Sequence, residues 1–456
     1  MLLNCALHQK SGQPERAKGG PGEALSGIGG DEAGLAQHEP KGLGRNDLLL
    51  QVVERENMVK AWKHVKANRG SAGVDGLTIE ATIEYLKTEW ARIREELLTG
   101  TYRPKPVRWV AIPKPGGDKR DLGIPTVIDR LIQQALLQIL QPLIDPTFSK
   151  SSYGFRPGRR AQDAVLQAQR YVQEGYRVVV DIDLERFFDR VNHDVLMDRL
   201  SKRINDKAVL RLIRRYLEAG VMAQGVTKER DEGTPQGGPL SPLLANVLLD
   251  EVDRELELRG HKFVRYADDC NVYVRSQKAG ERVLKGMRKL YDRLHLKVNE
   301  SKTAVTCAYG RKFLGFHFWQ GPGGEIRRAV AHKAIATFKK RIRQITRRTC
   351  GRSLKEVAEE LRRYMPGWKA YFKMAQTPSI FQELDGWLRH RLRALQLKQW
   401  RRGTTVYREV RKMGASEEQA LRVAVNVRRW WHKSRYEMNR VMPIAYFDKL
   451  GVPRLS

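Results

Sequence analysis

The tetrapeptide Tyr266-Ala267-Asp268-Asp269 constrains the fold of this chain more than any other stretch. It lies between two apolar runs, 263–265 and 271–274, that alternate as half-buried strands do, so it predicts the tip of a short hairpin. Two adjacent carboxylates at such a tip repel each other. A divalent cation that bridges them removes this repulsion, whereas a solvated loop leaves both carboxylates in water.

A second acidic strand upstream favours the metal site. Residues 177–183 form a β-branched run that ends in Asp181 and Asp183. Phosphoryl or nucleotidyl transfer with two metal ions needs a further carboxylate beside the first pair. The two acidic strand ends therefore leave two alternatives open, a two-metal site and a pair of solvated turns.

The positive charge of the chain indicates a polyanionic partner. It has 84 Lys and Arg against 52 Asp and Glu, a formal net charge of +32. Nucleic acid is the leading candidate. A membrane surface is the alternative, although no apolar run approaches the ~18–20 residues of a spanning helix. Residues 327–456 hold 32 Lys and Arg against 10 Asp and Glu, which predicts that the polyanion binds there.

Length and cysteine content favour a folded protein of a reducing compartment. A chain of 456 residues with 41% hydrophobic content is sufficient for two to four structural units. The N-terminus lacks the pattern of a secretory signal. The four cysteines are scattered without a Cys-x-x-Cys pair, which argues against structural zinc and against a disulfide scaffold. We expect a cytoplasmic protein.

Apolar periodicity divides the chain into segments. Residues 1–45 are rich in glycine and hold little that could pack, which predicts a flexible extension. Their glycine cluster does not fit a phosphate loop, because no strand precedes it and no helical pattern follows. The later pattern predicts a helical stripe, two further helices, a β-hairpin, an apolar helix and a compact strand. The helical stripe is 48–65, and the two further helices are 79–98 and 129–143. The arms of the hairpin are 109–113 and 120–124, the apolar helix is 243–256 and the compact strand is 313–316.

Two loops carry further signals. Residues 152–160 mix aromatic rings with guanidinium groups, which suits a phosphate backbone with stacked bases. A surface loop with incidental charge is the alternative. Residues 233–242 form a glycine-punctuated turn that opens the helix at 243–256. Its glycines permit close backbone approach, and Gln236 can hydrogen-bond a base or a ribose.

In order and content, eight blocks resemble the reverse transcriptases of bacterial group II introns, the maturase family. The resemblance runs from about residue 46 to the C-terminus. The blocks are RENMVKAWKHVKANRGSAGVDG, WVAIPKPGGDKRDLGIPTVIDRLIQQAL, SSYGFRPGRRAQDAV, DIDLERFFDRVNHDVL, GTPQGGPLSPLLANVLLDEVD, RYADDC, LKVNESKT and FLGFHF. The chain lacks the Cys-pair, His-Asn-His endonuclease domain that many members carry, and in this it is similar to the compact IIC lineage.

The resemblance implies an α+β fold, the right hand of polymerases. Its parts would be fingers, a palm with an antiparallel sheet, a helical thumb that forms the maturase domain, and a small basic DNA-binding region. In this sequence they would cover 46–175, 176–330, 331–400 and 401–456.

The resemblance also assigns roles to residues. Asp183, Asp268 and Asp269 would be the catalytic carboxylates that hold two magnesium ions, for which manganese can substitute, together with the carbonyl of Ile182. Asp183 matches rather than Asp181 because it lies five residues before Phe188. Nucleotide-binding residues would be Lys114, Arg120, Phe188, Gln236 and Lys302. Nucleic-acid contacts would be Arg156, Arg159, Arg160, Phe313, Gly315, Lys339, Lys340, Arg341, Trp368, Lys369 and Tyr371.

These implications lead to an RNA-directed DNA polymerase, a nucleotidyltransferase, encoded by a mobile group II intron. Its partners would be the intron RNA, an RNA template with a DNA primer, deoxynucleotide triphosphates and a DNA target, and it would act in splicing and retrohoming. A nucleoid-associated location in the bacterial cytoplasm is expected. One alternative is a domesticated relative in phage defence or DNA repair. Another is a non-catalytic RNA-binding splicing factor, against which the intact carboxylates argue.

Overall fold

The computed structural model describes residues 47–113, 119–223, 226–228, 232–234, 237–349 and 351–456. The predicted extension at 1–45 lies outside these residues. The chain divides into two compact units. The first contains the described parts of 1–159, 181–271 and 282–303, and the second contains 160–180, 272–281 and 304–456.

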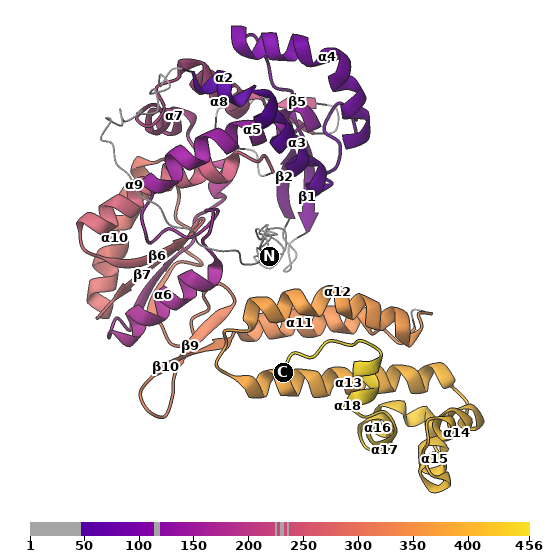
Figure 1. The fold of residues 1–456 in the computed structure, drawn as a ribbon. Coiled ribbons are helices and arrows are strands. Elements are labelled where there is room, and N and C mark those ends of the chain that lie inside the picture. Colours follow the sequence, from indigo (N-terminus) through magenta and orange to yellow (C-terminus); the bar gives the residue numbers. More distant parts are fainter. Residues whose placement is uncertain (1–46, 114–118, 224–225, 229–231, 235–236, 350) are drawn as a thin grey trace, which may run out of the picture. The chain divides into compact units, whose positions relative to one another are not determined.

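The first unit begins with helices that follow the predicted apolar stripes. The stripe at 48–65 is two helices, α2 (Leu48–Val52) and α3 (Arg55–Asn68), because the backbone at Glu54 is extended, with φ −63° and ψ 139°. The next two predicted helices are confirmed as α4 (Ile79–Thr99) and α5 (Val127–Ile144). Helices α2, α3 and α4 all contact α5 (Figure 1).

The predicted N-terminal hairpin is also confirmed. Strand β1 (Val107–Pro113) pairs antiparallel with β2 (Lys119–Ile124), in a register that places Arg108 opposite Ile124. A four-stranded sheet of order β2-β1-β4-β5 results, with β4 (Val221–Ala223) and β5 (Val226–Lys228) on its other side. The remaining helices before β8 are α6 (Ala161–Gln173), α7 (His193–Ser201), α8 (Lys207–Glu218), α9 (Ser241–Leu258) and α10 (Gln277–Arg293).

The acidic strands form a second four-stranded sheet, of order β6-β7-β3-β8. Its members are β3 (Val178–Ile182), β6 (Lys262–Tyr266), β7 (Asp269–Val274) and β8 (Ala304–Cys307), so the predicted acidic hairpin is confirmed as β6 and β7.

Strand β7 is more deeply buried than the predicted half-buried pattern. Every residue from Cys270 to Val274 is buried. Tyr273 packs on Tyr171 of α6, with ring centroids 5.8 Å apart, and a Cβ on Gly280 of α10 would lie 3.5 Å from Val274. Because successive strand residues face opposite sides, helices cover both faces of the strand (Figure 1).

The second unit is mostly helical. A hairpin of β9 (Phe316–Gln320) and β10 (Ile326–Val330) leads into α11 (His332–Ile345), α12 (Leu354–Phe372) and α13 (Pro378–Trp400). Helices α11 to α13 contact one another in sequence and lie side by side (Figure 1). Shorter helices follow: α14 (Gly403–Lys412), α15 (Glu417–Ala424), α16 (Trp430–Arg435), α17 (Glu437–Val441) and α18 (Ile444–Lys449).

One predicted strand is wrong. Residues 313–316 form a tight turn that enters β9, in which the backbones of Phe313 and Phe316 exchange hydrogen bonds. Leu314 and Gly315 have φ values of +47° and +85°, which an extended strand does not allow. Among the described helices, none combines the length and the apolar character needed to cross a membrane.

Candidate active site

The predicted carboxylates lie at the ends of neighbouring strands. Asp183 follows β3 directly, Asp268 lies in the turn after β6, and Asp269 opens β7. Strands β3 and β7 are neighbours in the sheet. With its amide nitrogen turned toward the acceptor, Asn271 donates to Asp181 Oδ1 at 2.9 Å. Asn271 lies two residues after Asp269 in β7, and Asp181 lies two residues before Asp183. The strand ends that carry Asp269 and Asp183 therefore meet at one edge of the sheet.

Asp183 is fixed by hydrogen bonds of its main chain, and its carboxylate lies near the ammonium group of a lysine. Its N–H donates to Thr303 Oγ1 at 3.2 Å, and its carbonyl accepts from the amide of Asn299 at 2.8 Å. Its carboxylate Oδ2 lies 3.4 Å from Lys302 Nζ, and the Asp183 side chain is 30% exposed. The predicted basic segment therefore places the ammonium group of Lys302 beside the Asp183 carboxylate, whose negative charge attracts it.

The hairpin tip packs tightly against the loop at 152–160. Ala267 is buried in the turn with φ +58°, a left-handed conformation uncommon for a residue with a side chain. A Cβ on Gly154 would lie 2.1 Å from the Ala267 nitrogen, so no larger residue fits there. The amide of Tyr153 donates to the Arg265 carbonyl at 2.8 Å. The loop is therefore a support of the acidic turn.

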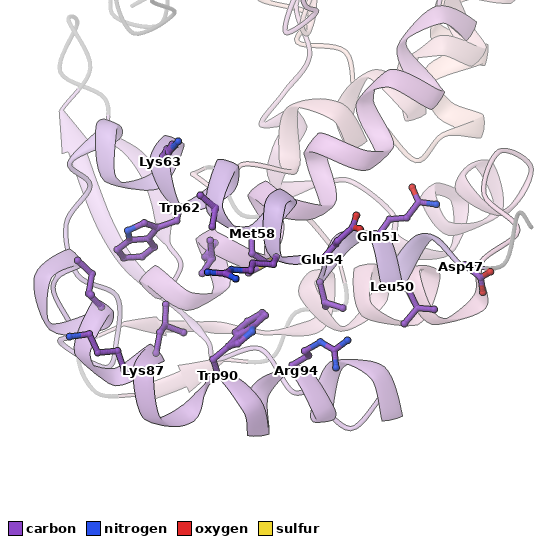
Figure 2. A pocket seen from close by; sticks show the side chains of 16 residues that line it. Asp47, Leu50, Gln51, Glu54, Met58, Trp62, Lys63, Lys87, Trp90 and Arg94 are labelled. Carbon is purple, nitrogen blue, oxygen red and sulfur yellow. The ribbon is translucent and has the colours of Figure 1, made fainter. Parts of the chain in front are cut away.

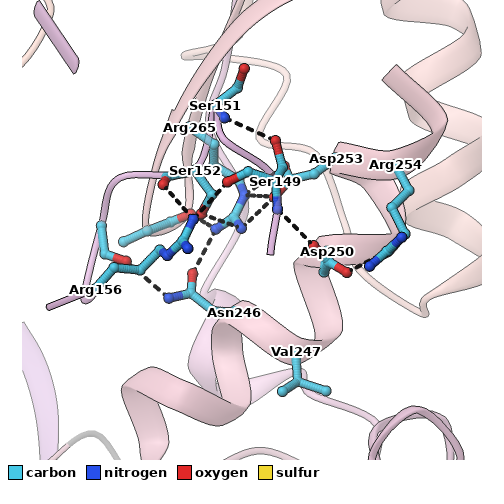
Figure 3. A network of polar contacts seen from close by, with 12 residues as sticks. Ser149, Ser151, Ser152, Arg156, Asn246, Val247, Asp250, Asp253, Arg254 and Arg265 are labelled. Carbon is cyan, nitrogen blue, oxygen red and sulfur yellow. Dashed lines mark hydrogen bonds and ion pairs between the residues drawn. The ribbon is translucent and has the colours of Figure 1, made fainter. Parts of the chain in front are cut away.

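A buried arginine connects this support to the helix behind it (Figure 3). The side chain of Arg265 is only 1% exposed, and every N–H of its guanidinium group has an acceptor. Nε donates to Asp253 at 2.8 Å and Nη1 to Asn246 Oδ1 at 2.9 Å. Nη1 also donates to the Ala267 carbonyl at 3.0 Å, inside the turn, and Nη2 donates to Ser152 Oγ at 2.8 Å and to Asp253 at 2.6 Å.

The charge of Arg265 is secured by its partner. Burial opposes that charge, but Asp253 raises the pKa of Arg265 overall. This network was not predicted from the sequence. The signals were an arginine directly before the acidic turn in an otherwise apolar strand, and Asn246, Asp250 and Asp253 at positions i, i+4 and i+7 of an apolar helix.

The glycine-punctuated loop crosses toward the first sheet. Thr234 donates its amide to the Phe188 carbonyl at 2.7 Å. Phe188 is buried in the short helix that follows Asp183, edge-on to Phe187 at 5.1 Å between ring centroids. At Gly237, with φ +144°, a Cβ would lie 2.5 Å from the Gly123 carbonyl oxygen near the end of β2. This loop therefore connects the Phe188 segment to the strand that contains Arg120. Lys114 and Gln236 lie outside the described residues.

Arg156 was predicted, together with Arg159 and Arg160, to contact nucleic acid, and its surroundings do not agree with this role. It is buried, its Nε donates to Asp145 Oδ1 at 2.9 Å, and its Nη1 donates to the carbonyls of Ser149 and Ser152 at 2.6 and 3.0 Å. These bonds make it a structural brace rather than a contact for a phosphate. Arg160 has a side chain 74% exposed, and Arg159 lies over the Tyr153 ring at 5.4 Å.

Several residues assigned to nucleic acid in the second unit are core residues instead. Trp368 is 1% exposed and packs against Phe338 with ring centroids 4.4 Å apart. Tyr371 is buried and donates its hydroxyl to the Leu314 carbonyl at 2.9 Å. Phe313 is buried, and a Cβ on Gly315 would lie 3.2 Å from Phe372. In this structure they hold the turn before β9 against α12, which corrects their assignment as direct contacts.

The cationic residues of the same set remain accessible. Lys340 and Arg341 are exposed on α11. Lys339 lies 3.5 Å from Glu383 and over the Trp387 ring. Lys369 donates to the Arg454 carbonyl at 3.1 Å.

The donor chemistry of the acidic edge fits a hard divalent cation, which prefers carboxylate and carbonyl oxygens. The ammonium of Lys302 beside Asp183 shows that positive charge is accommodated there. Across the described ranges, however, no three His, Cys, Asp or Glu side chains already converge as a metal-binding group.

A separate apolar hollow lies between α2, α3 and α4 (Figure 2). It has a volume of about 1150 Å³, and Trp62 and Trp90 contribute its aromatic walls. None of the predicted site residues lines it, so we do not assign it to the acidic site.

Two family models match separate stretches of this chain. Residues 112–318 match the family described as "Reverse transcriptase (RNA-dependent DNA polymerase)", and residues 335–414 match "Group II intron, maturase-specific domain". Protein YkfC of Escherichia coli (strain K12) is 37% identical over 218 residues, which are 46% of this chain and 57% of that protein. Group II intron-encoded protein LtrA of Lactococcus lactis subsp. cremoris is 30% identical over 336 residues, 59% of this chain and 56% of that protein.

Among solved structures, a chain of a partial Cas6-RT-Cas1–Cas2 complex is 27% identical, with a TM-score of 0.36, over 54% of this chain and 42% of that chain. The present chain therefore matches less than two thirds of the length of each of these relatives.

Proposed function

Because the chain belongs to the group II intron reverse transcriptase and maturase family, we propose that it is an RNA-directed DNA polymerase that also assists splicing and reinsertion of its own intron. The observation that carries this proposal is the meeting of Asp183 with Asp268 and Asp269 at one sheet edge, inside the stretch that matches reverse transcriptases. Nucleotidyl transfer requires carboxylates that can hold two metal ions together, and these three lie at the ends of strands of one sheet.

In this proposal the parts of a right hand follow the observed elements. Fingers at 46–175 would contain the helices around α5 and the β1–β2 hairpin, and a palm at 176–330 would contain the acidic sheet. The thumb at 331–400 would be α11 to α13, and a DNA-binding region at 401–456 would be α14 to α18. The positive charge of the last 130 residues supports a nucleic-acid partner there, because the excess is one-signed.

The carboxylates of Asp183, Asp268 and Asp269, with the Ile182 carbonyl, would hold two Mg²⁺ ions, for which Mn²⁺ can substitute. When bound, such ions promote deprotonation of the primer 3′-hydroxyl and neutralise charge on the triphosphate. The chain itself orients these ligands through Arg265 and the backbone around Asp183. Lys302 would meet the departing pyrophosphate, while Arg120 together with Lys114 would bind the triphosphate.

Primer extension tests the proposal. We expect the purified protein to extend a DNA primer on an RNA template with deoxynucleotide triphosphates and Mg²⁺. A protein that binds intron RNA and promotes splicing but never extends the primer would instead be a splicing factor. Extension without any preference for intron RNA would support the domesticated relative.

Phe188→Ala is expected to admit ribonucleotides. The Phe188 carbonyl accepts from the amide of Thr234, and in this proposal removing the ring opens space beside the sugar of an incoming nucleotide. We expect the deoxy-to-ribo preference in primer extension to fall about tenfold or more. Phe187→Ala is the matched control, since it removes a buried ring of equal size next door. An equal change in both variants, or none in Phe188→Ala, would contradict the role.

The thumb assignment predicts a strong salt dependence of RNA binding. Each phosphate contact adds roughly 0.7–0.9 to the slope of log affinity against log salt. Replacing Lys339, Lys340 and Arg341 together by glutamine is expected to weaken binding and flatten this slope. The control is a triple replacement on α10, at the exposed positions Arg282, Lys285 and Lys289. Retention of the full slope by the α11 variant would place the RNA elsewhere.

A further inference from the structure

Helix α13 contains a buried arginine with unused donors. Arg389 is only 3% exposed, and its Nε and Nη2 have no hydrogen-bond partner among the described residues. Its Nη1 lies 3.4 Å from Asp385 Oδ1. Leaving charged donors buried without acceptors is costly, so such groups normally indicate an acceptor that is still to be supplied.

Arg389 is one of the residues that line a small cavity of about 240 Å³. At ~30 Å³ per water, this is room for one phosphate group with some of its hydration. Two more guanidinium groups line the cavity, those of Arg393 and Arg454, together with the amide of Asn439. Arg393 is 4% exposed and donates its Nε to the Met442 carbonyl at 2.9 Å.

Positive charge exceeds negative charge around this cavity. Asp385 is the one acidic residue that lines it, and its Oδ2 already accepts from the amides of Leu455 and Ser456 at 3.0 and 2.9 Å. Burial, and then the charge of Arg389, lower the pKa of Arg393 to about 10, so this guanidinium is still charged at neutral pH. Three guanidinium groups line the cavity with the carboxylate of Asp385, and Arg454 is already paired with Asp448 through its Nε at 2.9 Å. The groups left for an anion are therefore those of Arg389 and Arg393.

We propose that this cavity binds a single phosphate group, either from a nucleic-acid backbone or as a free phosphate ion. The two unpartnered nitrogens of Arg389, Nε and Nη2, form one edge of the guanidinium plane, and that edge donates to two oxygens of a phosphate at once. The site does not depend on polymerase chemistry, and its test measures binding alone.

Thermal unfolding in increasing inorganic phosphate, at constant ionic strength, tests the site. For the full chain we expect a saturable rise of the unfolding midpoint. Arg389→Met removes the bidentate edge and is expected to weaken phosphate binding about tenfold or more. Arg440→Met is the matched control, because Arg440 is exposed and lies outside the cavity. It is expected to respond as the wild type does.

Circular dichroism and a second variant, Arg389→Lys, control for misfolding. Arg389→Met removes a buried charge that lacks full pairing and should fold, as circular dichroism would show. Arg389→Lys keeps the charge without the planar edge and is also expected to lose affinity. An identical phosphate response of the wild type and Arg389→Met would overturn the site, as would an equal loss in Arg440→Met.

Binding of an end-labelled single-stranded RNA distinguishes the two phosphate sources. If Arg389→Met weakens RNA binding and inorganic phosphate competes with RNA on the wild type, the ligand is a backbone phosphate. If the variant loses only the response to inorganic phosphate, the pocket binds the free ion.

Discussion

Asp183→Asn and Asp268→Asn are each expected to abolish DNA synthesis on an RNA template, by roughly a thousandfold or more. The reason is that each removes a negative charge from the edge where β3 and β7 meet, which is the proposed metal site. Divalent ions stabilise the transition state by several kcal/mol, and each 1.36 kcal/mol is tenfold in rate. RNA affinity should stay within a few-fold, because the positive charge is concentrated in residues 327–456. Primer extension and filter binding on the same preparations measure both quantities.

Asp181→Asn is the sharpest control for this prediction. Asp181 lies on the same strand and accepts from Asn271, yet the family pattern selects Asp183 as the ligand. We expect Asp181→Asn to retain most of the synthesis. Loss of synthesis in Asp181→Asn with extension at the wild-type rate in Asp183→Asn would move the metal ligand to the other residue.

Arg265→Met should lower both stability and synthesis strongly. It leaves Asp253 buried without its partner, and breaking a buried ion pair costs about 3–5 kcal/mol. It also removes the donor that Arg265 gives to the Ala267 carbonyl within the acidic turn. Chemical denaturation measures the first effect, and steady-state primer extension measures the second.

The double variant Arg265→Met with Asp253→Leu separates these two effects. Replacing a buried ion pair by apolar side chains is often neutral for stability. We therefore expect this variant to regain much of the lost stability while its kcat stays low and its KM for nucleotide changes little, because the turn is still unanchored. Full recovery of both stability and kcat would show that the network only stabilises the fold.

Arg254→Met is the matched control for the network. Arg254 pairs with the buried Asp250 at 2.7 Å, in the neighbouring set of contacts (Figure 3). Asp250 keeps Arg203 as a second partner at 2.5 Å, and Arg254 donates its Nη2 to the Thr147 carbonyl rather than to the acidic turn. We expect this variant to lose little synthesis.

Local patterns were sufficient for several elements of the first unit. The helices α4, α5 and α9 and both predicted hairpins follow from apolar spacing and turn residues, since these depend on neighbours a few positions away. The division of the first stripe at Glu54 and the turn at 313–316 were not predicted. Both depend on backbone conformations that apolar periodicity does not specify.

The sequence by itself determined the acidic turn, the second acidic strand, the excess of positive charge and the order of the eight blocks. Only the tertiary structure decided which arginines and aromatic residues are buried. Arg265 is buried because Ser152, 113 positions away, and the carboxylate of Asp253 satisfy it. Arg156 and Trp368 resembled nucleic-acid contacts by type, but distant partners enclose them. Arg389 is buried too, yet part of it has no partner among the described residues. Burial depends on residues that are far apart in the chain, and side-chain type alone does not specify it.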